Sequence, residues 1–225
     1  MDISFLVTSH NESNELQRIL NQLTGHIVKN NTNDEIVVLD DYSDNPETLK
    51  ILAHSEKQPF VTVHRRSLNK DFGAHKTAGS MACNKKFIVQ LDADEFLSDQ
   101  LLENLSGIID ANPTVELYRL PRVNIVRNIT PEDAAKWGWR VTELQEFPGL
   151  SVVNFPDYQS RVYKKSDHIR WNKKLHETVV GADVTTDFPN DPAYAIIHDK
   201  TIERQRIQNE FYMRNWSTEA NMGRG

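Results

Sequence analysis

The stretch FIVQLDADE, residues 87–95, does most to indicate the fold of this chain. Its apolar first part, residues 87–91, predicts a buried strand, and this strand ends directly in Asp92 and Asp94. Carboxylates two residues apart at a strand end offer hard oxygen ligands, which magnesium and manganese prefer, and leave room for water and phosphate. Asp-x-Asp is also a common way to begin a turn or to cap a helix, so the motif depends on its context.

Upstream of this stretch, predicted strands and helices alternate. The expected strands are residues 3–8, 35–39 and 60–64. The expected helices follow the caps Asn11, Asn45-Pro46 and Ser98, and one more covers residues 74–83. Because alternation with short links implies parallel strands and right-handed crossovers, we expect an α/β fold with a doubly wound, mostly parallel sheet and helices on both faces.

The second half of the chain is less regular. The expected strands are a long or paired strand at residues 115–126 and short strands at 152–153, 161–163, 178–180 and 195–197. The expected helices are a short one at residues 131–139 and a closing one at 201–216, capped by Thr201. We therefore predict a single domain over residues 1–225, with a regular half, 1–112, and an irregular half, 113–225.

Composition limits the class of protein. With 38% hydrophobic and 26% charged residues, the 225-residue chain has the balance of a globular domain and not of a disordered one. Its net charge of −6 argues against binding to nucleic acid through overall charge, so a polyanion would need a local basic patch. Cys83 is the single cysteine, and there is no apolar run of about 20 residues, so we expect a cytoplasmic protein without a transmembrane segment.

Polar residues also follow the first two predicted strands. They are VTSHNE, residues 7–12, and DDYSD, residues 40–44. Ligands in doubly wound sheets lie beyond the carboxyl ends of the strands, where these hydroxyls, amides and carboxylates suit a ribose or a base. The alternative is that residues such as Asn11 and Asp44 only cap helices. The glycine-rich motifs of dinucleotide enzymes and of P-loop NTPases are absent from the sequence.

Four motifs together resemble family 2 glycosyltransferases of the GT-A fold. These are residues 7–12, residues 40–44, NKDFGAHK at 69–76 and LDADE at 91–95. The resemblance implies an inverting enzyme that moves a sugar from a nucleoside diphosphate, often UDP, to a hydroxyl, with Mn²⁺ or Mg²⁺ as cofactor. It also implies that residues 1–112 bind the nucleotide sugar and residues 113–225 bind the acceptor.

The resemblance further implies roles for individual residues. The nucleoside and phosphate contacts would come from Thr8, His10, Glu12, Asp40, Asp41, Phe72, Gly73, Lys76 and Asp92. Asp94 would ligate the metal, with Asp92 and His198 as further ligands. The loop at 69–76 departs from the asparagine- and glycine-rich version common in the family, which leaves its phosphate contacts open.

Glu177 is the predicted general base. It closes the segment KLHE, residues 174–177, which resembles the His-Glu segment of a compact subset of the family. Inversion needs a base within hydrogen-bond reach of the acceptor hydroxyl, on the side opposite the leaving diphosphate. The alternative is an ordinary surface glutamate beside a loop that His176 orders.

A basic cluster in the second half predicts an anionic acceptor. The predicted acceptor-binding residues are Arg161, Lys164, Lys165, Trp171, Lys173, Lys174 and His176. Charge runs are usually solvated faces, and the alternative is therefore a plain strand pair. Two acceptors fit a basic groove: DNA with hydroxymethylated bases, as in phages and then in the host cytoplasm, or a phosphorylated glycan such as a lipopolysaccharide core.

Two other functions remain as alternatives at this point. One is a nucleotidyltransferase that makes nucleotide sugars, which usually begins with a glycine-rich basic loop that residues 8–12 lack. The other is a binding domain without catalysis, against which the intact carboxylates Asp92 and Asp94 argue.

Overall fold

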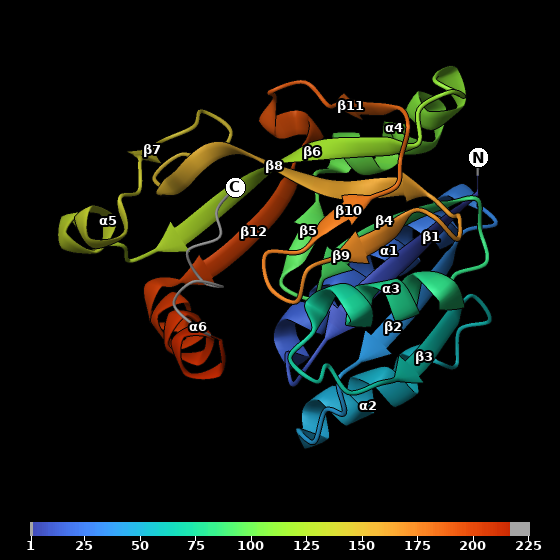
Figure 1. The fold of residues 1–225 in the computed structure, drawn as a ribbon, viewed down its shortest axis with the longest axis horizontal. Helices are drawn as coiled ribbons and strands as arrows, with labels where there is room; N and C mark the ends of the chain where they lie inside the picture. The colour runs from blue at the N-terminus through green and yellow to red at the C-terminus, as the bar shows by residue number, and fades with distance from the viewer. Residues whose placement is uncertain (1, 217–225) are drawn as a thin grey trace.

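The structure is a computed structural model that describes residues 2–216. Its first part alternates strands and helices as expected (Figure 1). In chain order the elements are β1 (Ile3–Ser9), α1 (Ser13–Asn30), β2 (Glu35–Asp40), α2 (Pro46–Ser55), β3 (Val61–Arg65), α3 (Phe72–Ala82) and β4 (Phe87–Asp92). Because β1 pairs in parallel with β2 and β4, and β2 with β3, the predicted parallel arrangement is confirmed.

The remaining elements extend the same sheet. They are β5 (Glu95–Leu97), α4 (Asp99–Ala111), β6 (Leu117–Arg127), α5 (Pro131–Trp137), β7 (Val141–Thr142), β8 (Val152–Lys164), β9 (Arg170–Asn172), β10 (Thr178–Val180), β11 (Thr185–Asp187), β12 (Ile196–Thr201) and α6 (Ile202–Asn215). The main sheet has the order β3-β2-β1-β4-β8-β6-β12-β5, and β9 and β10 form a separate pair. β8 runs antiparallel to β4 and β6, whereas β12 runs parallel to β6. One sheet therefore continues through both halves of the chain.

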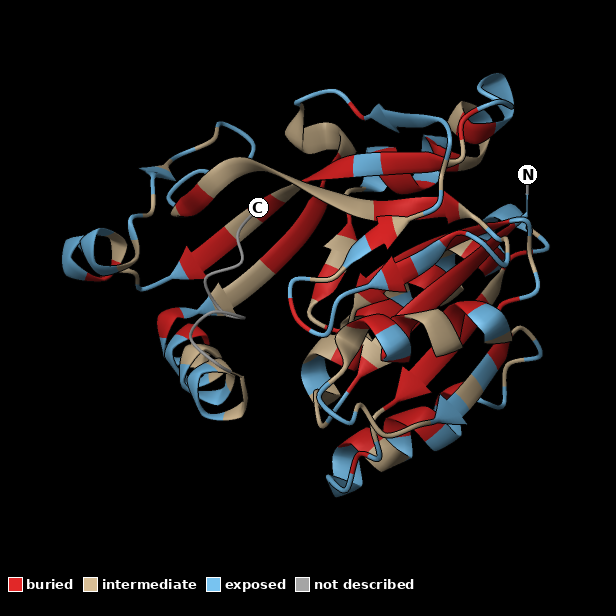
Figure 2. Cartoon of the chain, in the orientation of Figure 1, coloured by how far each residue is buried: buried red, intermediate tan, exposed pale blue. Residues whose placement is uncertain are grey.

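Helices cover both faces of the sheet, and the core lies between these layers. On one face, the apolar stripe of α1 packs with residues of α2 and α4 against β1, β2 and β4. On the other face, α3 and the β9–β10 pair cover side chains such as Leu6, Ile88 and Tyr163. Figure 2 shows the central strands as the most continuously buried part of the molecule. Because these strands are packed on both faces, their carboxyl ends are held in place and form one edge of the sheet.

The strand predictions for the second half were partly wrong. Residues 152–153 and 161–163 are the two ends of a single strand, β8. The middle of β8 is polar and only half-buried, as at Asn154, Tyr158 and Gln159, so its apolar pattern survives only near the ends. Residues 115–126, in contrast, correspond to one continuous strand, β6, which has irregular register with β8 at two points.

The predicted side-chain caps form at α2 and α6, whereas Ser98 occupies the N-cap position of α4 without a capping hydrogen bond and α1 begins differently. Asn45 accepts hydrogen bonds from the backbone of Glu47 and Thr48, and the Thr201 hydroxyl accepts one from Arg204 N. Asn11 is not a cap: the N-cap position of α1 is Glu12, and Asn11 has a φ of 58°. The Asn11 amide instead donates to the Asp44 carboxylate at 2.9 Å and thereby joins the loops after β1 and β2.

No helix within residues 2–216 combines the length and the apolar character needed to cross a membrane.

Candidate functional site

The polar segments after β1, β2 and β4 meet at one edge of the sheet, as the sequence predicts. Thr8, near the end of β1, is in register with Asp92, at the end of β4. The Thr8 hydroxyl donates to Asp92 Oδ1 over 2.7 Å. The neighbouring loop is held by Asp41, whose Oδ1 accepts a hydrogen bond from Leu68 N at 2.8 Å. The edge is therefore a connected polar surface and not a set of separate helix caps.

Asp92 is surrounded by cations. Lys76 Nζ lies 3.0 Å from its Oδ1, and Arg161 Nη2 lies 3.1 Å from its Oδ2. Burial by itself would raise the pKa of Asp92, but Lys76 and Arg161 bring that pKa well below the ordinary value. Asp92 is therefore ionised at neutral pH, and both of its oxygens already have cationic partners.

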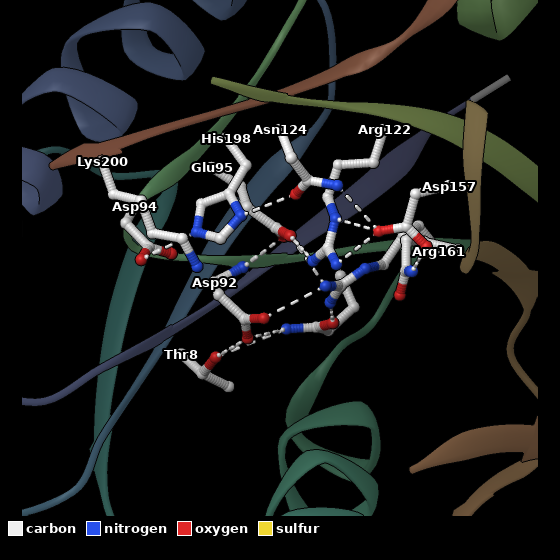
Figure 3. Close-up of polar contacts among 12 residues, drawn as sticks. Thr8, Asp92, Asp94, Glu95, Arg122, Asn124, Asp157, Arg161, His198 and Lys200 are labelled. Carbon is white, nitrogen blue, oxygen red and sulfur yellow. Dashed lines mark hydrogen bonds and ion pairs between the residues drawn. The ribbon is translucent and has the colours of Figure 1, made fainter. Parts of the chain in front are cut away.

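A chain of alternating charges runs from Asp92 into the second half of the molecule (Figure 3). Arg161 Nη2 and Arg122 Nη1 each lie 2.9 Å from Glu95 Oε1, and Arg122 Nη2 lies 2.7 Å from Asp157 Oδ2. Glu95 is only 1% exposed, so its charge depends on these two guanidinium groups. The chain joins the β4–β5 segment to β8 and β6.

Asp94 faces His198, which β12 contributes. His198 Nε2 lies 3.2 Å from Asp94 Oδ2, and His198 Nδ1 lies 3.1 Å from Asn124 Oδ1. The Asn124 amide nitrogen donates to Asp157 at 3.0 Å, which fixes the amide so that its oxygen points at the imidazole. Both ring nitrogens thus face oxygens, so His198 links Asn124 to Asp94.

The predicted set of three metal ligands is not assembled. Within residues 2–216, no group of three or more His, Cys, Asp or Glu side chains is placed to hold an ion. The reason is that Asp92 points toward Lys76 and Arg161, whereas Asp94 and His198 form a separate pair. Burial, the largest single effect, raises the pKa of Asp94, but His198 and Arg204 together bring it below the ordinary value, so Asp94 is ionised, as a metal ligand must be.

Lys76 links Asp92 to Glu177. The lysine is 3% exposed, and its Nζ lies 2.7 Å from Glu177 Oε1. It also lies 4.9 Å from the centre of the Trp171 ring, which restricts its position. Burial raises the pKa of Glu177, yet Lys76 lowers it further than that, and the net pKa is below the ordinary value. The glutamate is therefore an ionised, oriented carboxylate at the site, unlike an ordinary surface glutamate.

The N-terminus of α3 lies directly against the chain before Glu177. Phe72 N and Gly73 N donate to Lys174 O and Lys173 O at 3.0 and 3.2 Å. A Cβ atom at Gly73 would lie 2.4 Å from Lys173 O, so a side chain at this position would push the two segments apart. The Phe72 ring packs in a stack with Trp216 of the C-terminal part, with ring centres 5.7 Å apart.

Arg204, on the first turn of α6, reaches across to the first half of the chain. It pairs with Glu12 and Glu15, and its Nη2 lies 3.5 Å from Asp94 Oδ2. Burial and the nearby Asp94 raise the pKa of Glu12 to about 8, although Arg204 acts in the opposite direction. Glu12 is thus tied to α6 in this structure.

Two residues predicted to contact the nucleoside differ in accessibility. Asp40 is fully buried and accepts a hydrogen bond from Ser43 N at 3.0 Å, so it holds the loop and cannot reach a ligand. This part of the prediction was wrong, because a carboxylate that ends a strand can equally turn inward. His10 is exposed, and its Nδ1 lies 2.8 Å from Asp41 O.

The basic cluster does not form one groove. Arg161 and Trp171 are buried, and Trp171 Nε1 donates to the Tyr163 hydroxyl at 2.9 Å. Lys164 and Lys165 lie at the opposite edge of the sheet, because Lys164 is in register with Phe87 at the start of β4.

The prediction of one groove was wrong because β8 runs antiparallel to β4, so residues after Arg161 lie progressively farther from the carboxyl end of β4. The predicted acceptor residues that do lie beside the N-terminus of α3 and Glu177 are Lys173, Lys174 and His176, all exposed.

Several residues of the site were not identified from the sequence. They are Gln90, Glu95, Arg122, Asn124, Asp157, Lys200 and Arg204. Gln90 and Glu95 lie within FIVQLDADE and were therefore visible, whereas the others lie in segments without a motif.

Removing the Glu95 carboxylate tests the charge chain. We expect Glu95→Ala to lower the free energy of unfolding by about 3–5 kcal/mol, because the buried guanidinium group of Arg161 and the half-buried one of Arg122 would lose their shared partner. The matched control is Glu103→Ala, which breaks an exposed pair with Lys29 and costs about 1 kcal/mol or less. Urea unfolding measures both, and equal losses for the two variants would contradict this account.

Comparison with known proteins gives the family. The model for glycosyl transferase family 2 matches residues 4–178. No curated protein sequence matches the chain. Among solved structures, S. aureus TarS is similar with 15% identity and a TM-score of 0.59, over 89% of this chain and 37% of TarS.

A shorter form, TarS 1–349 in complex with UDP-GlcNAc, is also similar, with 15% identity and a TM-score of 0.56, over 89% of this chain and 59% of that one. The chain thus spans less than two thirds of the length of these relatives, and the likeness to them shows a common GT-A fold. Because the family model matches most of the chain, from β1 to the start of β10, the chain belongs to glycosyl transferase family 2.

Proposed function

We propose that this chain transfers a sugar from a nucleoside diphosphate, UDP, to an acceptor hydroxyl with inversion at the anomeric carbon. The observation that carries the proposal is the pair of ionised carboxylates Asp92 and Glu177 bridged by buried Lys76, at the ligand-binding edge of a family 2 domain. A similar fold, that of TarS 1–349, has been solved with UDP-GlcNAc, which supports UDP as the nucleotide. Membership of glycosyl transferase family 2 and the ionised carboxylates at this edge favour sugar transfer over nucleotide-sugar synthesis and over binding without catalysis.

The donor would lie along the ends of β1 and β4. Thr8, His10 and Asp41 present polar groups beside the nucleoside, and Asp92 accepts hydrogen bonds from the ribose or the sugar. Lys76 holds Asp92 ionised, so that this carboxylate stays an acceptor. Phe72 and Gly73 would form the side wall where α3 begins.

Asp94 and His198 have the chemistry of a site for a divalent metal. An ionised carboxylate oxygen and an imidazole nitrogen lie 3.2 Å apart, and Asn124 orients the imidazole from behind. Two protein ligands suit Mn²⁺ or Mg²⁺ in such enzymes, because substrate phosphates and water complete the coordination. When bound, the metal would neutralise negative charge on the diphosphate.

Glu177 would act as the general base. As the acceptor oxygen attacks the anomeric carbon, a Glu177 oxygen takes the hydroxyl proton, and the bond to the diphosphate breaks with its electron pair on the leaving group. The ion pair with Lys76 keeps Glu177 deprotonated and fixes its direction. No covalent enzyme intermediate is required in this scheme.

For the acceptor, the exposed Lys173 and Lys174 beside Glu177 support an anionic molecule. Hydroxymethylated DNA and a phosphorylated glycan both satisfy this requirement, and a screen of the two acceptor classes distinguishes them. The free, buried Cys83 fits our proposal of a cytoplasmic enzyme.

Thermal unfolding with UDP tests the donor site. At a UDP concentration about one hundred times its Kd, we expect Tm to rise by about 5–10 °C with Mn²⁺ and by much less without it. Asp94→Asn should remove the manganese-dependent part, whereas Asp187→Asn, in an exposed pair with Arg119, should keep it. No stabilisation of the wild-type protein by UDP with manganese would overturn the proposal.

Substitution of Glu177 tests the base. We expect Glu177→Gln to lower kcat by about 10²–10⁴-fold and to change the affinity for UDP little, since the base acts on the acceptor. Because the pKa of Glu177 lies below 4.5, wild-type kcat should stay constant down to about pH 5 and fall only in more acidic solution. The control is Glu47→Gln, on the exposed face of α2, and kcat values within threefold for both variants would exclude Glu177 as the base.

A further inference from the structure

Lys200, on β12, is a half-buried cation that forms no close ion pair within residues 2–216, although the carboxylates of Asp94 and Glu95 act on it at longer range. Its Nζ donates to Gln208 Oε1 at 3.2 Å, and residues 2–216 provide no carboxylate oxygen within 4.0 Å of it. Figure 3 shows the Lys200 side chain beside Asp94 and His198. A partly desolvated ammonium group costs free energy unless an anion accompanies it, so this position suits a negatively charged ligand.

Arg204 adds a second cation from the same turn of the chain. It follows Lys200 by four residues, and the Thr201 hydroxyl between them accepts a hydrogen bond from Arg204 N at 3.3 Å, which fixes the start of α6. Arg204 contacts Glu12, Glu15 and Asp94, and its side chain is 32% exposed. Its guanidinium group therefore lies next to Asp94 and His198, the two proposed metal ligands, and remains accessible to a bound molecule.

Ion pairs contribute to the attachment of α6. Its buried residues are Ile202 and Gln205, both close to its start, whereas Ile207 and Met213 are exposed. Farther along the helix, Arg206 pairs with Asp133 of α5 at 2.9 Å. The ion pairs of Arg204 connect the start of α6 to Glu12 and Glu15 in the donor half, and the packing of Tyr212 against Phe72 connects the later part of the helix to α3.

We propose that Lys200 and Arg204 bind the diphosphate of the nucleotide sugar, so that the junction of β12 and α6 forms the second side of the donor site. This inference rests on the proposed function and names the protein partners of the donor's phosphates. Arg204 exchanges its carboxylate partners for phosphate oxygens, which a guanidinium group can bind with two parallel hydrogen bonds. Lys200 contributes a point charge to the same anion.

The position of the metal favours this exchange. A divalent cation between Asp94 and His198 would lie close to Arg204, whose Nη2 is 3.5 Å from the same Asp94 oxygen. Repulsion between a bound metal ion and Arg204 would weaken the pair of Arg204 with Asp94, while a bound diphosphate would bring negative charge to both cations. Donor binding would therefore turn Arg204 from Asp94 to the phosphates.

A purely structural role for Arg204 makes a different prediction. If the residue only fastened α6, its loss would weaken uridine and UDP binding by the same factor. If it binds phosphate, the loss must grow with the number of phosphates on the ligand.

The experiment measures Kd by calorimetry for uridine, UMP and UDP with Mn²⁺ in four proteins: wild type, Lys200→Met, Arg204→Met and Arg206→Met. We expect the first two variants to bind UDP about tenfold more weakly or worse and to bind uridine within about twofold of wild type. Arg206→Met removes an ion pair of the same helix outside the site and should match wild type for all three ligands. The free Lys200→Met protein should melt at or above the wild-type Tm, because the unpaired cation is gone.

Three results would overturn the inference. If wild type binds UDP and both variants bind it equally well, the diphosphate has other partners and the proposed function stands. If each variant loses affinity for uridine and UDP by the same factor, the role is structural. If wild type does not bind UDP with Mn²⁺ at all, the proposed function fails together with this inference.

Discussion

The site depends on the buried chain of charges that begins at Asp92 and passes through Arg161, Glu95 and Arg122. Each carboxylate in this chain lies between cations, and each guanidinium lies between carboxylates. Such a network is costly to disrupt, because loss of one member leaves its largely desolvated neighbours with fewer compensating charges. The alternating pattern therefore holds the end of β4 in one arrangement.

This network also connects the parallel part of the sheet to the part that contains antiparallel strands. The parallel strands β1 to β4 are joined by helices, whereas β8, β6 and β12 come from the irregular half and include antiparallel neighbours. Arg161 on β8 and Arg122 on β6 both reach Glu95, which follows the aspartates of β4. Residues far apart in the sequence thus converge on the edge where the donor would bind.

Asp92 and Asp94 have different proposed roles because their neighbours differ. Asp92 has fixed cations on both oxygens, which suits it to accept hydrogen bonds from a substrate and not to bind a metal. Asp94 instead faces a histidine and a partly exposed arginine, both of which can change partner. The lowered pKa of both carboxyl groups keeps them ionised at neutral pH.

Much of the first half was predictable from the sequence because its signals are local. The apolar runs of β1 and β4, the cap at Asn45 and the motif around Asp92 each depend on residues a few positions apart. The second half was harder to predict. The polar middle of β8 hides a long strand, and Lys164 lies beside the start of β4, whereas Asp92 lies at its end. Arg204 and Lys200 gave no signal, because their role depends on where β12 and α6 lie in space.

The most direct measurement is a crystal of this protein grown with UDP and Mn²⁺ and examined by anomalous diffraction at the manganese edge. The account predicts one manganese peak bonded to Asp94 Oδ2, His198 Nε2 and oxygens of the diphosphate, with Lys76 still between Asp92 and Glu177. A manganese peak on Asp92 instead, or UDP bound away from the ends of β1 and β4, would contradict it.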